Sequence, residues 1–295
     1  MILIVVLYAF LGLSFTLGKM TLFFASPFYV VGLRMVIGGV LLSVFLSLFK
    51  STQYEFQIKD WPYFAHVTLF GIVIPYCLRA WGLQYVSSTK AAFIFTLMPF
   101  FTALFSYLFH HEKLSYQKSM GLLLGFVGMM PTLFTTGVSE EQVGSVVFFS
   151  WPELALLGAA ASFGYNYIAL KTLITKRQCP ALVANMVTML LGGVIALSLA
   201  FMVEPIWLRK DPITFFALLA LQIVISNLLC AHLQASLLKT YSPTLMAFAS
   251  LLVPLCASVF GWVLLHEVIH VQYMISLALI LAGLALFYLD EITTL

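Results

Sequence analysis

The feature that most constrains this chain is a series of long apolar stretches with almost no charged residues. A segment needs about 20 mostly apolar residues to cross a bilayer as a helix. Ten stretches meet this criterion, at about 2–18, 27–49, 61–81, 86–109, 115–134, 152–170, 180–203, 213–236, 243–265 and 271–289. Apolar and polar residues do not alternate within them, which indicates helices rather than barrel strands. We therefore expect an all-α integral membrane protein with ten transmembrane helices.

The composition supports this class and narrows the functions. Only 8% of the 295 residues are charged, whereas a soluble protein carries roughly 25%. The net charge is +3 without a basic cluster, so we expect no nucleic acid as a partner. The expected partners are a small-molecule solute, the lipid bilayer and, as an alternative to a monomer, a second copy in a homodimer. The sequence has no P-loop motif, and we expect no cofactor.

An internal repeat divides the chain into two halves. Aligning 78–128 with 233–283 without gaps gives 16 identities in 51 positions. The matched residues include Pro99 with Pro254, His111 with His266 and Glu112 with Glu267. Five helices in each half place the second half upside down in the membrane. Such inverted repeats are common in secondary transporters, whose solute site lies near the midplane between the halves.

The repeat and the charges together predict an organisation for the chain. We expect a first repeat at 1–134 with helices 1–5, an external linker at 135–151, and a second repeat at 152–295 with helices 6–10. With the N-terminus inside, eight cations lie on cytoplasmic loops, namely Lys50, Lys59, Lys113, Lys118, Lys171, Lys176, Arg177 and Lys239. Five lie outside, namely Lys19, Arg79, Lys90, Arg209 and Lys210. This excess predicts cytoplasmic termini and a multi-pass protein of the bacterial cytoplasmic (inner) membrane.

A motif that runs through both halves resembles a known family. It consists of Gly12-x-Ser14-Phe15-x3-Lys19, Pro27, Arg34, Pro99, Glu112, Gly121 and Gly128. This pattern resembles that of the EamA family in the drug/metabolite transporter superfamily, over essentially the whole chain. The resemblance implies ten helices, cytoplasmic termini and a central cavity for small organic solutes, which in the family include amino acids, nucleosides, drugs and S-adenosylmethionine. The second half departs from the pattern because it has no arginine at the position of Arg34.

The candidates for the solute cavity are mainly polar and aromatic residues found in only one half, because features shared by both halves are expected to be scaffold. Ser14 is added as the symmetric partner of Asn166, and Phe93 as a ring that suits stacking on a flat solute. The set is Ser14, Arg34, Trp81, Lys90, Phe93, Tyr165, Asn166, Asn227, His232 and Gln234. We expect no acid deep in a helix to pair with Arg34, which then either attracts an anionic group of the solute or binds backbone carbonyls. Lys90 either extends to the outer interface or binds a carboxylate. Ser14 and Asn166 also suit hydrogen bonds between helices.

The duplicated prolines and acids are expected to have structural or gating roles. Pro99 and Pro254 remove a backbone hydrogen bond and kink their helices, which either shapes packing or opens one side of the cavity. Glu112 and Glu267 are expected to accept hydrogen bonds from the first backbone N–H groups of the following helix. The segment from His266 to His270 matches H-E-x-x-H, which on one helix would bind zinc. We consider a metalloenzyme a remote alternative because the repeat partner lacks the second histidine.

These observations predict a secondary transporter, not an enzyme. We expect it to move a small polar metabolite, an amino acid or an amino-acid-bearing compound, by alternating access. Arg34 and Lys90 suit a carboxylate, and the aromatic residues suit a flat group. S-adenosylmethionine, exchanged for S-adenosylhomocysteine, has both features and is the specific alternative, together with a nucleoside.

Overall fold

The computed structural model describes residues 2–49, 54, 57–110, 116–133, 143–146, 149–241, 246, 250, 252–268 and 270–293. This part of the chain contains ten helical segments, five in each half. In the first half, the first, second and fifth segments are the single helices α1 (Ile2–Leu22), α2 (Pro27–Phe49) and α7 (Tyr116–Leu133). The third segment consists of η1 (Ile58–Asp60), α3 (Trp61–Thr68), η2 (Leu69–Val73) and α4 (Ile74–Leu83). The fourth consists of α5 (Ser88–Ile94), η3 (Phe95–Leu97) and α6 (Met98–His110).

The second half begins with a short antiparallel hairpin and repeats the five-helix series. Strand β1 (Ser145–Val146) pairs with β2 (Phe149–Ser150), with Ser145 opposite Ser150. The helices are α9 (Trp151–Thr175), α10 (Ala181–Val203), an eighth segment built from α11 (Pro212–Gln222), η4 (Ile223–Cys230) and α12 (Ala231–Thr240), then α14 (Leu252–Leu265) and α15 (Val271–Thr293). Each helical segment overlaps one expected stretch, so the all-α membrane fold is confirmed.

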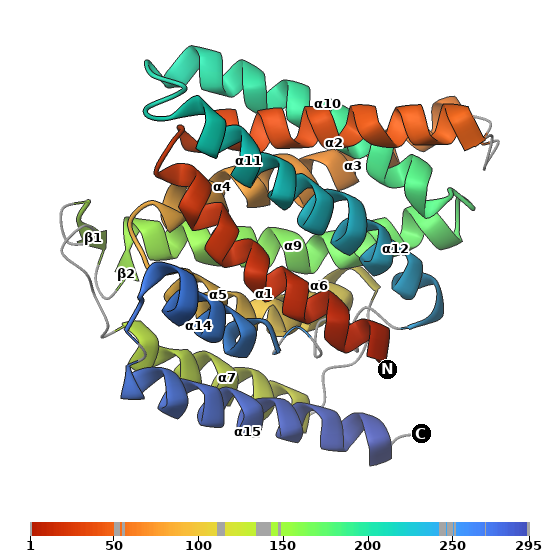
Figure 1. Cartoon of the computed structure of the whole chain (residues 1–295). Coiled ribbons are helices and arrows are strands. Elements are labelled where there is room, and N and C mark those ends of the chain that lie inside the picture. Colours follow the sequence, from red (N-terminus) through yellow and green to blue (C-terminus); the bar gives the residue numbers. More distant parts are fainter. Residues whose placement is uncertain are drawn as a thin grey trace.

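The helices form three layers (Figure 1). α2 and α10 lie side by side on one flank, and α7 and α15 lie side by side on the other. Between them, α1 packs against α14 and α9 packs against α6, so the first helix of each half contacts the fourth segment of the other half. This reciprocal pairing interlocks the two halves and places the third and eighth segments around the centre.

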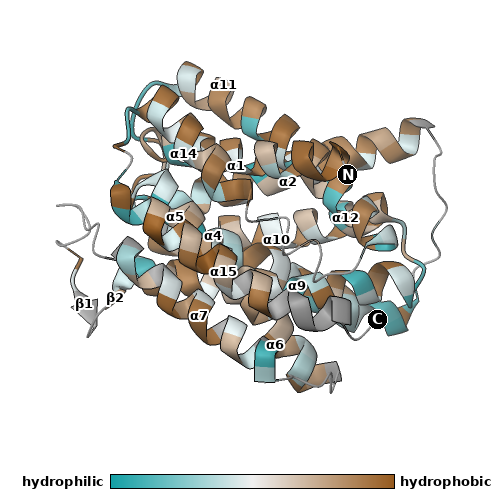
Figure 2. Ribbon diagram, turned by 90° about the horizontal axis from the view of Figure 1, so that it is seen from below, coloured by the Kyte–Doolittle hydropathy of each residue, from teal (hydrophilic) through white to brown (hydrophobic). Residues whose placement is uncertain are grey.

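Apolar residues make up most of the helical ribbon (Figure 2), and many of them are exposed on the flanks. Six helices among the described residues are long and apolar enough to cross a membrane. On α2 and α10 the exposed large apolar side chains are Val40, Leu41, Val44, Phe45, Leu48, Leu191, Val194, Ile195, Phe201, Met202 and Val203. Exposing such an apolar surface to water is unfavourable, so it suits contact with lipid. The helices can lie in lipid because their backbone hydrogen bonds are satisfied within each helix.

Glycines allow α2 and α10 to approach closely. A Cβ atom added to Gly193 would lie 2.7 Å from the backbone nitrogen of Val36, and one added to Gly32 would lie 2.6 Å from that of Leu197. A backbone nitrogen cannot move aside as a side-chain end can. Close packing of small residues is the main attraction between helices in lipid, where no hydrophobic force joins them.

We predict that Gly193→Ala lowers the melting temperature of the purified protein by several degrees, because the two helices must separate. A loss of about 1–3 kcal/mol is usual for overpacking. Thermal unfolding in detergent measures the effect. Gly158→Ala is the matched control, because its new Cβ atom would meet only the end of the Leu78 side chain, at 3.3 Å. Equal melting temperatures for the two variants would contradict the prediction.

Two wide π-helical turns interrupt the third and eighth segments at corresponding places in the two halves. They span Leu69–Val73 and Ile223–Cys230. The offset of about 155 residues that aligns the two halves places the first turn within the second. Pro75 follows the first turn and cannot donate a backbone hydrogen bond, which favours an irregular turn there. π-turns are frequent at functional sites. Here they lie beside Tyr76 and Gln222, which face the centre of the molecule.

The prolines of the repeat lie near the beginning of helices rather than in the middle. The fourth segment breaks into the 3₁₀ turn Phe95–Leu97, and Pro99 lies in the first turn of α6. Pro254 is the third residue of α14, and most of the residues between 242 and 251, before this helix, are outside the described part of the chain. The expected kink at Pro99 is therefore a break between two short helices.

The described residues of the H-E-x-x-H segment are not helical. His266–Val268 and His270 lie in the connection between α14 and α15, and His266 has a φ of 54°. The two histidines thus lack the common helical face that the zinc arrangement requires. No group of three potential metal ligands gathers among the described residues.

Candidate functional site

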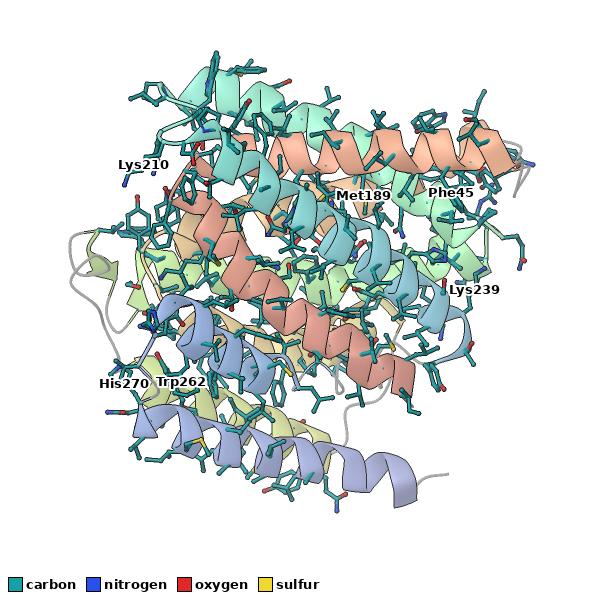
Figure 3. The ribbon with its side chains drawn as sticks, in the orientation of Figure 1. Phe45, Met189, Lys210, Lys239, Trp262 and His270 are labelled. Atoms are coloured by element: carbon teal, nitrogen blue, oxygen red, sulfur yellow. The ribbon has the colours of Figure 1, made fainter. Side chains whose placement is uncertain are left out.

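The two ends of the helical bundle differ in how they are closed. We call the latch end the end at which α1 finishes and α2 begins, and the opposite end the N-terminal end. Figure 3 shows Lys210 at the latch end and Lys239 at the N-terminal end. Carboxylates of the second half hold helices of the first half at the latch end.

Glu204, directly after α10, caps the beginning of α2. Its carboxylate accepts hydrogen bonds from the backbone nitrogens of Phe28 and Tyr29 at 2.8 and 3.1 Å and from the Ser26 hydroxyl at 2.5 Å. A carboxylate at this position satisfies free backbone donors and interacts favourably with the helix dipole. A backbone bridge between Ala25 and Leu208 lies next to it.

Glu267 caps the beginning of α5 in the same manner. It accepts hydrogen bonds from the backbone nitrogens and the hydroxyl groups of Ser88 and Thr89, at 2.7–3.1 Å. Lys19 Nζ lies 4.0 Å from the carboxylate and also donates to the carbonyl of Val86. The expectation that Glu267 caps the helix that follows it is therefore wrong, since α5 belongs to the other half. Its repeat partner Glu112 lies outside the described residues.

A single ion pair joins described residues at the N-terminal end. Arg177, after α9, donates to Asp60 at the beginning of the third segment, with Nε at 2.6 Å from Oδ1. The Asp60 carboxylate raises the pKa of Arg177 above its usual range. Tyr54 donates to the same acid at 2.8 Å. Burial, together with this hydrogen bond, raises the pKa of Tyr54 above its usual range.

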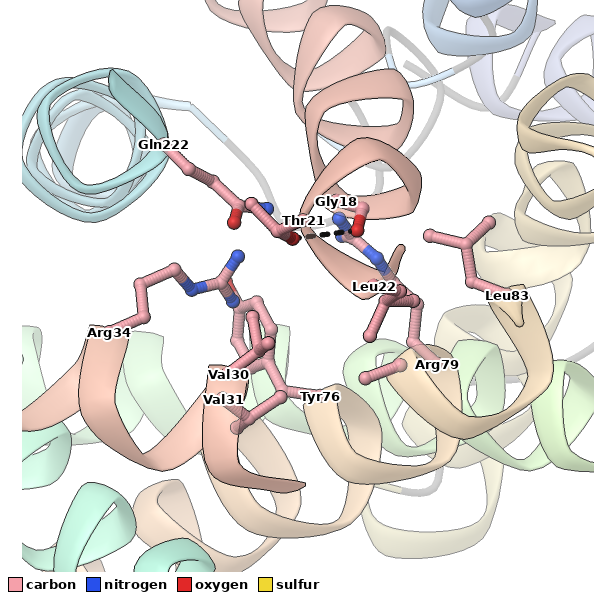
Figure 4. Close-up of a pocket in the computed structure, with 11 residues that line it drawn as sticks. Gly18, Thr21, Leu22, Val30, Val31, Arg34, Tyr76, Arg79, Leu83 and Gln222 are labelled. Atoms are coloured by element: carbon pink, nitrogen blue, oxygen red, sulfur yellow. Dashed lines mark hydrogen bonds between the residues drawn. The ribbon is translucent and has the colours of Figure 1, made fainter. Parts of the chain in front are cut away.

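Two connected chambers lie between the ends, at the centre of the molecule. The first, which we call the Arg chamber, is lined by Gly18, Thr21, Leu22, Val30, Val31, Arg34, Tyr76, Arg79, Ala80, Leu83 and Gln222 (Figure 4). The second, which we call the aromatic chamber, is lined by Tyr8, Leu11, Phe15, Tyr76, Arg79, Phe95, Met98, Phe163, Tyr167, Gln234, Ser250 and Val253. Tyr76 and Arg79 border both chambers, so these are adjoining parts of one site between the halves.

The arginines of the Arg chamber are buried without an acidic partner among the described residues. Arg34 and Arg79 are 3% and 7% exposed. The guanidinium of Arg34 lies 4.8 Å from the centre of the Tyr76 ring, and that of Arg79 lies 4.1 Å from the centre of the Phe15 ring. Arg79 Nη2 also donates to the Ser14 carbonyl at 3.2 Å, whereas Arg34 Nε has no hydrogen-bond partner. Ring contacts offset only about 0.5–2 kcal/mol of the several that a buried charge costs.

The aromatic chamber supplies flat faces and a few polar groups. The rings of Phe15 and Phe95 meet edge to face with their centres 5.1 Å apart, and the ring centres of Phe163 and Tyr76 lie 5.2 Å apart. The hydroxyl groups of Tyr8 and Tyr167 lie 3.5 Å apart, and Tyr8 donates to the carbonyl of Met246. No Asp or Glu lines either chamber among the described residues. The site thus suits a solute with an anionic group and a flat apolar group.

The chambers are contracted. The cavity volume is about 20 Å³ in the Arg chamber and about 60 Å³ in the aromatic chamber, counted as the space that the centre of a water molecule can occupy. One water needs roughly 10–15 Å³ on this scale. Because pockets for drug-sized ligands have volumes of roughly 300–1,000 Å³, a larger solute enters only after helices move.

Three of the residues proposed from the sequence lie in or beside the two chambers. Arg34 lines the Arg chamber, Gln234 lines the aromatic chamber, and the Ser14 hydroxyl lies 3.4 Å from Arg79 Nη2. Arg34 is the residue that both the sequence and the geometry single out. Its positive charge lies deep in the bundle, as the position seven residues beyond Pro27 predicts.

Lys90 does not reach the interface and is not available as a solute ligand in this structure. Its ammonium lies 2.8 Å from Glu153 Oε1, and each side chain is 1% exposed. Glu153 also caps its own helix by accepting a hydrogen bond from the Ser150 backbone nitrogen at 2.7 Å. Glu153 is thus a buried acid at the beginning of α9, but it pairs with Lys90 and not with Arg34.

The other proposed aromatic residues lie elsewhere. Phe93 is 2% exposed and stacks on Tyr273 at 5.1 Å. Trp81 lines a pocket of about 400 Å³ at the latch end, away from both chambers. Tyr165 meets Phe70 edge to face at 4.9 Å in a separate groove. These residues pack helices or border surface pockets rather than the central site.

The remaining polar residues contact neighbouring helices or their own helix. Asn166 packs against Gly71, where the π-turn of the third segment widens. Asn227 lies in the second π-turn and donates to the sulfur of Met35 at 3.0 Å. His232 lies 3.5 Å from the Ser236 hydroxyl of the same helix. None of the three lines either chamber.

Several residues of the site were missed at the level of sequence. Arg79 is near the end of an expected span and was assigned to the outer surface, but its helix continues to Leu83 and buries it. Gln222 is a single polar residue in a long apolar run, which was an available signal. Nothing in the sequence marks Tyr76 as a residue of the site, because a tyrosine in a membrane helix usually packs against other helices or faces the interface.

Comparisons with known proteins agree with this architecture. The sequence matches the EamA-like transporter family over residues 1–134 and 150–289. It is 32% identical over 285 residues to an S-adenosylmethionine/S-adenosylhomocysteine transporter of Chlamydia muridarum, covering 94% of this chain and 88% of that protein. A Chlamydia trachomatis serovar L2 protein of the same name is 32% identical over 94% of this chain and 85% of its own length.

More distant similarities extend over nearly the whole chain. The uncharacterised Bacillus subtilis transporter YvbV is 26% identical, covering 93% of this chain and 87% of that protein. One crystal structure superimposes with a TM-score of 0.64 at 18% identity, covering 97% of this chain and 98% of that one, which shows a shared fold. The family match spans nearly all of the sequence and both halves of the fold, so this membrane protein is a transporter and belongs to the EamA-like transporter family.

Proposed function

We propose that this transporter exchanges S-adenosylmethionine and S-adenosylhomocysteine across the bacterial cytoplasmic membrane. The observation that carries the proposal is a pair of buried arginines, without an acidic partner among the described residues, beside a chamber lined with aromatic rings. The names of the two Chlamydia relatives support the same solutes.

The chemistry of these solutes matches the two chambers part by part. Their amino-acid carboxylate suits Arg34 and Arg79, because guanidinium groups bind carboxylates with short charge-assisted hydrogen bonds. Their flat adenine suits stacking on aromatic rings, and the sulfonium of S-adenosylmethionine is attracted to ring faces. A free amino acid would leave the aromatic chamber unfilled, and a nucleoside would leave the arginines unpaired.

Alternating access follows from the way the ends are joined. Glu204 and Glu267 hold the latch end closed, and the contracted chambers require helices to part. Since Arg79 and Lys90 are buried, the latch end keeps only Lys19, Arg209 and Lys210 of the five cations counted there. The eight cations that the sequence assigns to cytoplasmic loops outnumber these three and favour cytoplasmic termini, so we propose that the latch end faces outward. Chambers without a carboxylate suit solute exchange better than a carboxylate proton relay.

Exchange in proteoliposomes tests the proposal. Vesicles loaded with S-adenosylhomocysteine should take up external labelled S-adenosylmethionine several times faster than empty vesicles. Methionine and adenosine, each carrying half of the solute, should compete at least about tenfold more weakly than S-adenosylhomocysteine, because each fills one chamber. Full competition by methionine alone, or no uptake into loaded vesicles, would show that the solute is a different one.

A further inference from the structure

We propose that the Arg chamber binds a single small inorganic anion of the size of chloride, which occupies the site when the carboxylate of a solute does not. The anion site itself rests on the geometry of the chamber. Its competition with solute rests on the function proposed above.

The first reason is charge. Two guanidinium groups share this chamber, and no Asp or Glu lines it among the described residues. Arg34 is only 3% exposed, and its Nε atom has no hydrogen-bond partner among the described residues. A buried charge without a counter-charge costs several kcal/mol, and far less when an anion binds it. An empty chamber with a double positive charge is therefore the least stable arrangement of these residues.

The second reason is the direction of the polar groups. Figure 4 shows the guanidinium of Arg34 and the side-chain amide of Gln222 extending into the same space beside Tyr76. Gln222 is 1% exposed, and its Oε1 atom has no hydrogen-bond partner. A turn of the amide exchanges oxygen and nitrogen and presents two N–H donors to an anion. The hydroxyl of Thr21 already donates to the Gly18 carbonyl at 2.8 Å.

The third reason is size. About 20 Å³ of the chamber is open to the centre of a water-sized sphere, which is room for about one such centre. The remaining wall is formed by apolar side chains, among them Val30, Val31 and Leu83. A monatomic halide or one carboxylate oxygen fits this space. Sulfate and phosphate carry four oxygens and do not fit without movement of the helices.

Thermal unfolding of the purified full chain, without solute, tests the anion site. The melting temperature should rise saturably when chloride or bromide replaces gluconate at constant ionic strength, and sulfate should give no such rise. Arg34→Gln should abolish the saturable rise, and Gln222→Met, which keeps the volume, should weaken halide affinity at least about tenfold. Arg209→Gln is the control, because Arg209 contacts Gln84 at the latch end and should leave the rise unchanged.

A second measurement separates this inference from the proposed function. Halide should raise the apparent Kd for S-adenosylmethionine in proportion to its concentration, as a competitor for the carboxylate position does. Equal melting temperatures in chloride and gluconate with normal solute exchange would overturn the anion site alone. A saturable halide effect in a protein that moves no adenosyl compound would overturn the proposed solute alone. Bromide anomalous scattering away from Arg34 and Gln222 would also exclude this site.

Discussion

Replacing Arg34 with glutamine is expected to reduce the affinity for S-adenosylmethionine by about 10- to 100-fold. A hydrogen bond to a charged group contributes about 1.5–3 kcal/mol, and each 1.4 kcal/mol is a factor of ten. Arg34 is a suitable position for the test because its Nε makes no hydrogen bond within the described protein. The substitution therefore removes a positive charge and, among the described contacts, only the one between the guanidinium and the Tyr76 ring. Equilibrium binding of labelled solute to the purified variant measures the effect.

The controls distinguish loss of a ligand from loss of the fold. Arg209→Gln removes an equal charge at the latch end and should leave binding unchanged. Arg79→Gln should also weaken binding, but it breaks the hydrogen bonds to Ser14 and the contact with Phe15 and should therefore also lower the melting temperature. An Arg34→Gln variant that binds S-adenosylmethionine with unchanged affinity would show that the carboxylate lies elsewhere.

The contrast between these two arginines shows what a sequence can reveal about this site. Arg34 lies in the middle of an apolar run, so its burial follows directly from its position. Arg79 lies two residues before the expected end of its span, and the interface was an equally good position for it. Its burial depends on α1, where it contacts the Ser14 carbonyl and the Phe15 ring. Such a contact joins residues far apart in the chain and leaves no local pattern.

The ten helices were predictable because each depends on local length and polarity. The π-turns were not, because a wide turn differs from a regular helix by a single residue and leaves the apolar pattern almost intact. The partners of charged residues were also hidden. Lys90 and Glu153 both resemble interfacial residues when each helix is considered alone. They meet only because α5 packs against α9.

Replacing Glu267 with glutamine is expected to open the latch end, increasing the population of the open conformer by about 5- to 140-fold. The carboxylate accepts four hydrogen bonds from Ser88 and Thr89. A glutamine keeps one acceptor oxygen, but its amide N–H groups would face the donors of Ser88 and Thr89. It also lacks the negative charge that interacts favourably with the α5 dipole and with Lys19. Removing a charged acceptor from buried donors costs about 1–3 kcal/mol, and each 1.4 kcal/mol corresponds to a tenfold shift.

Maleimide labelling of a cysteine at Ala80, in a chain whose four native cysteines are replaced, measures this opening. Ala80 is 9% exposed and lines the Arg chamber, so it should react slowly while the latch is closed and several times faster in Glu267→Gln. Asp211→Asn is the matched control, because Asp211 caps its own helix through Ile213 and Thr214 and joins no other segment. An equal increase in both variants would indicate general loosening. Unchanged labelling in Glu267→Gln, at an unchanged melting temperature, would show that this carboxylate does not hold the two halves together.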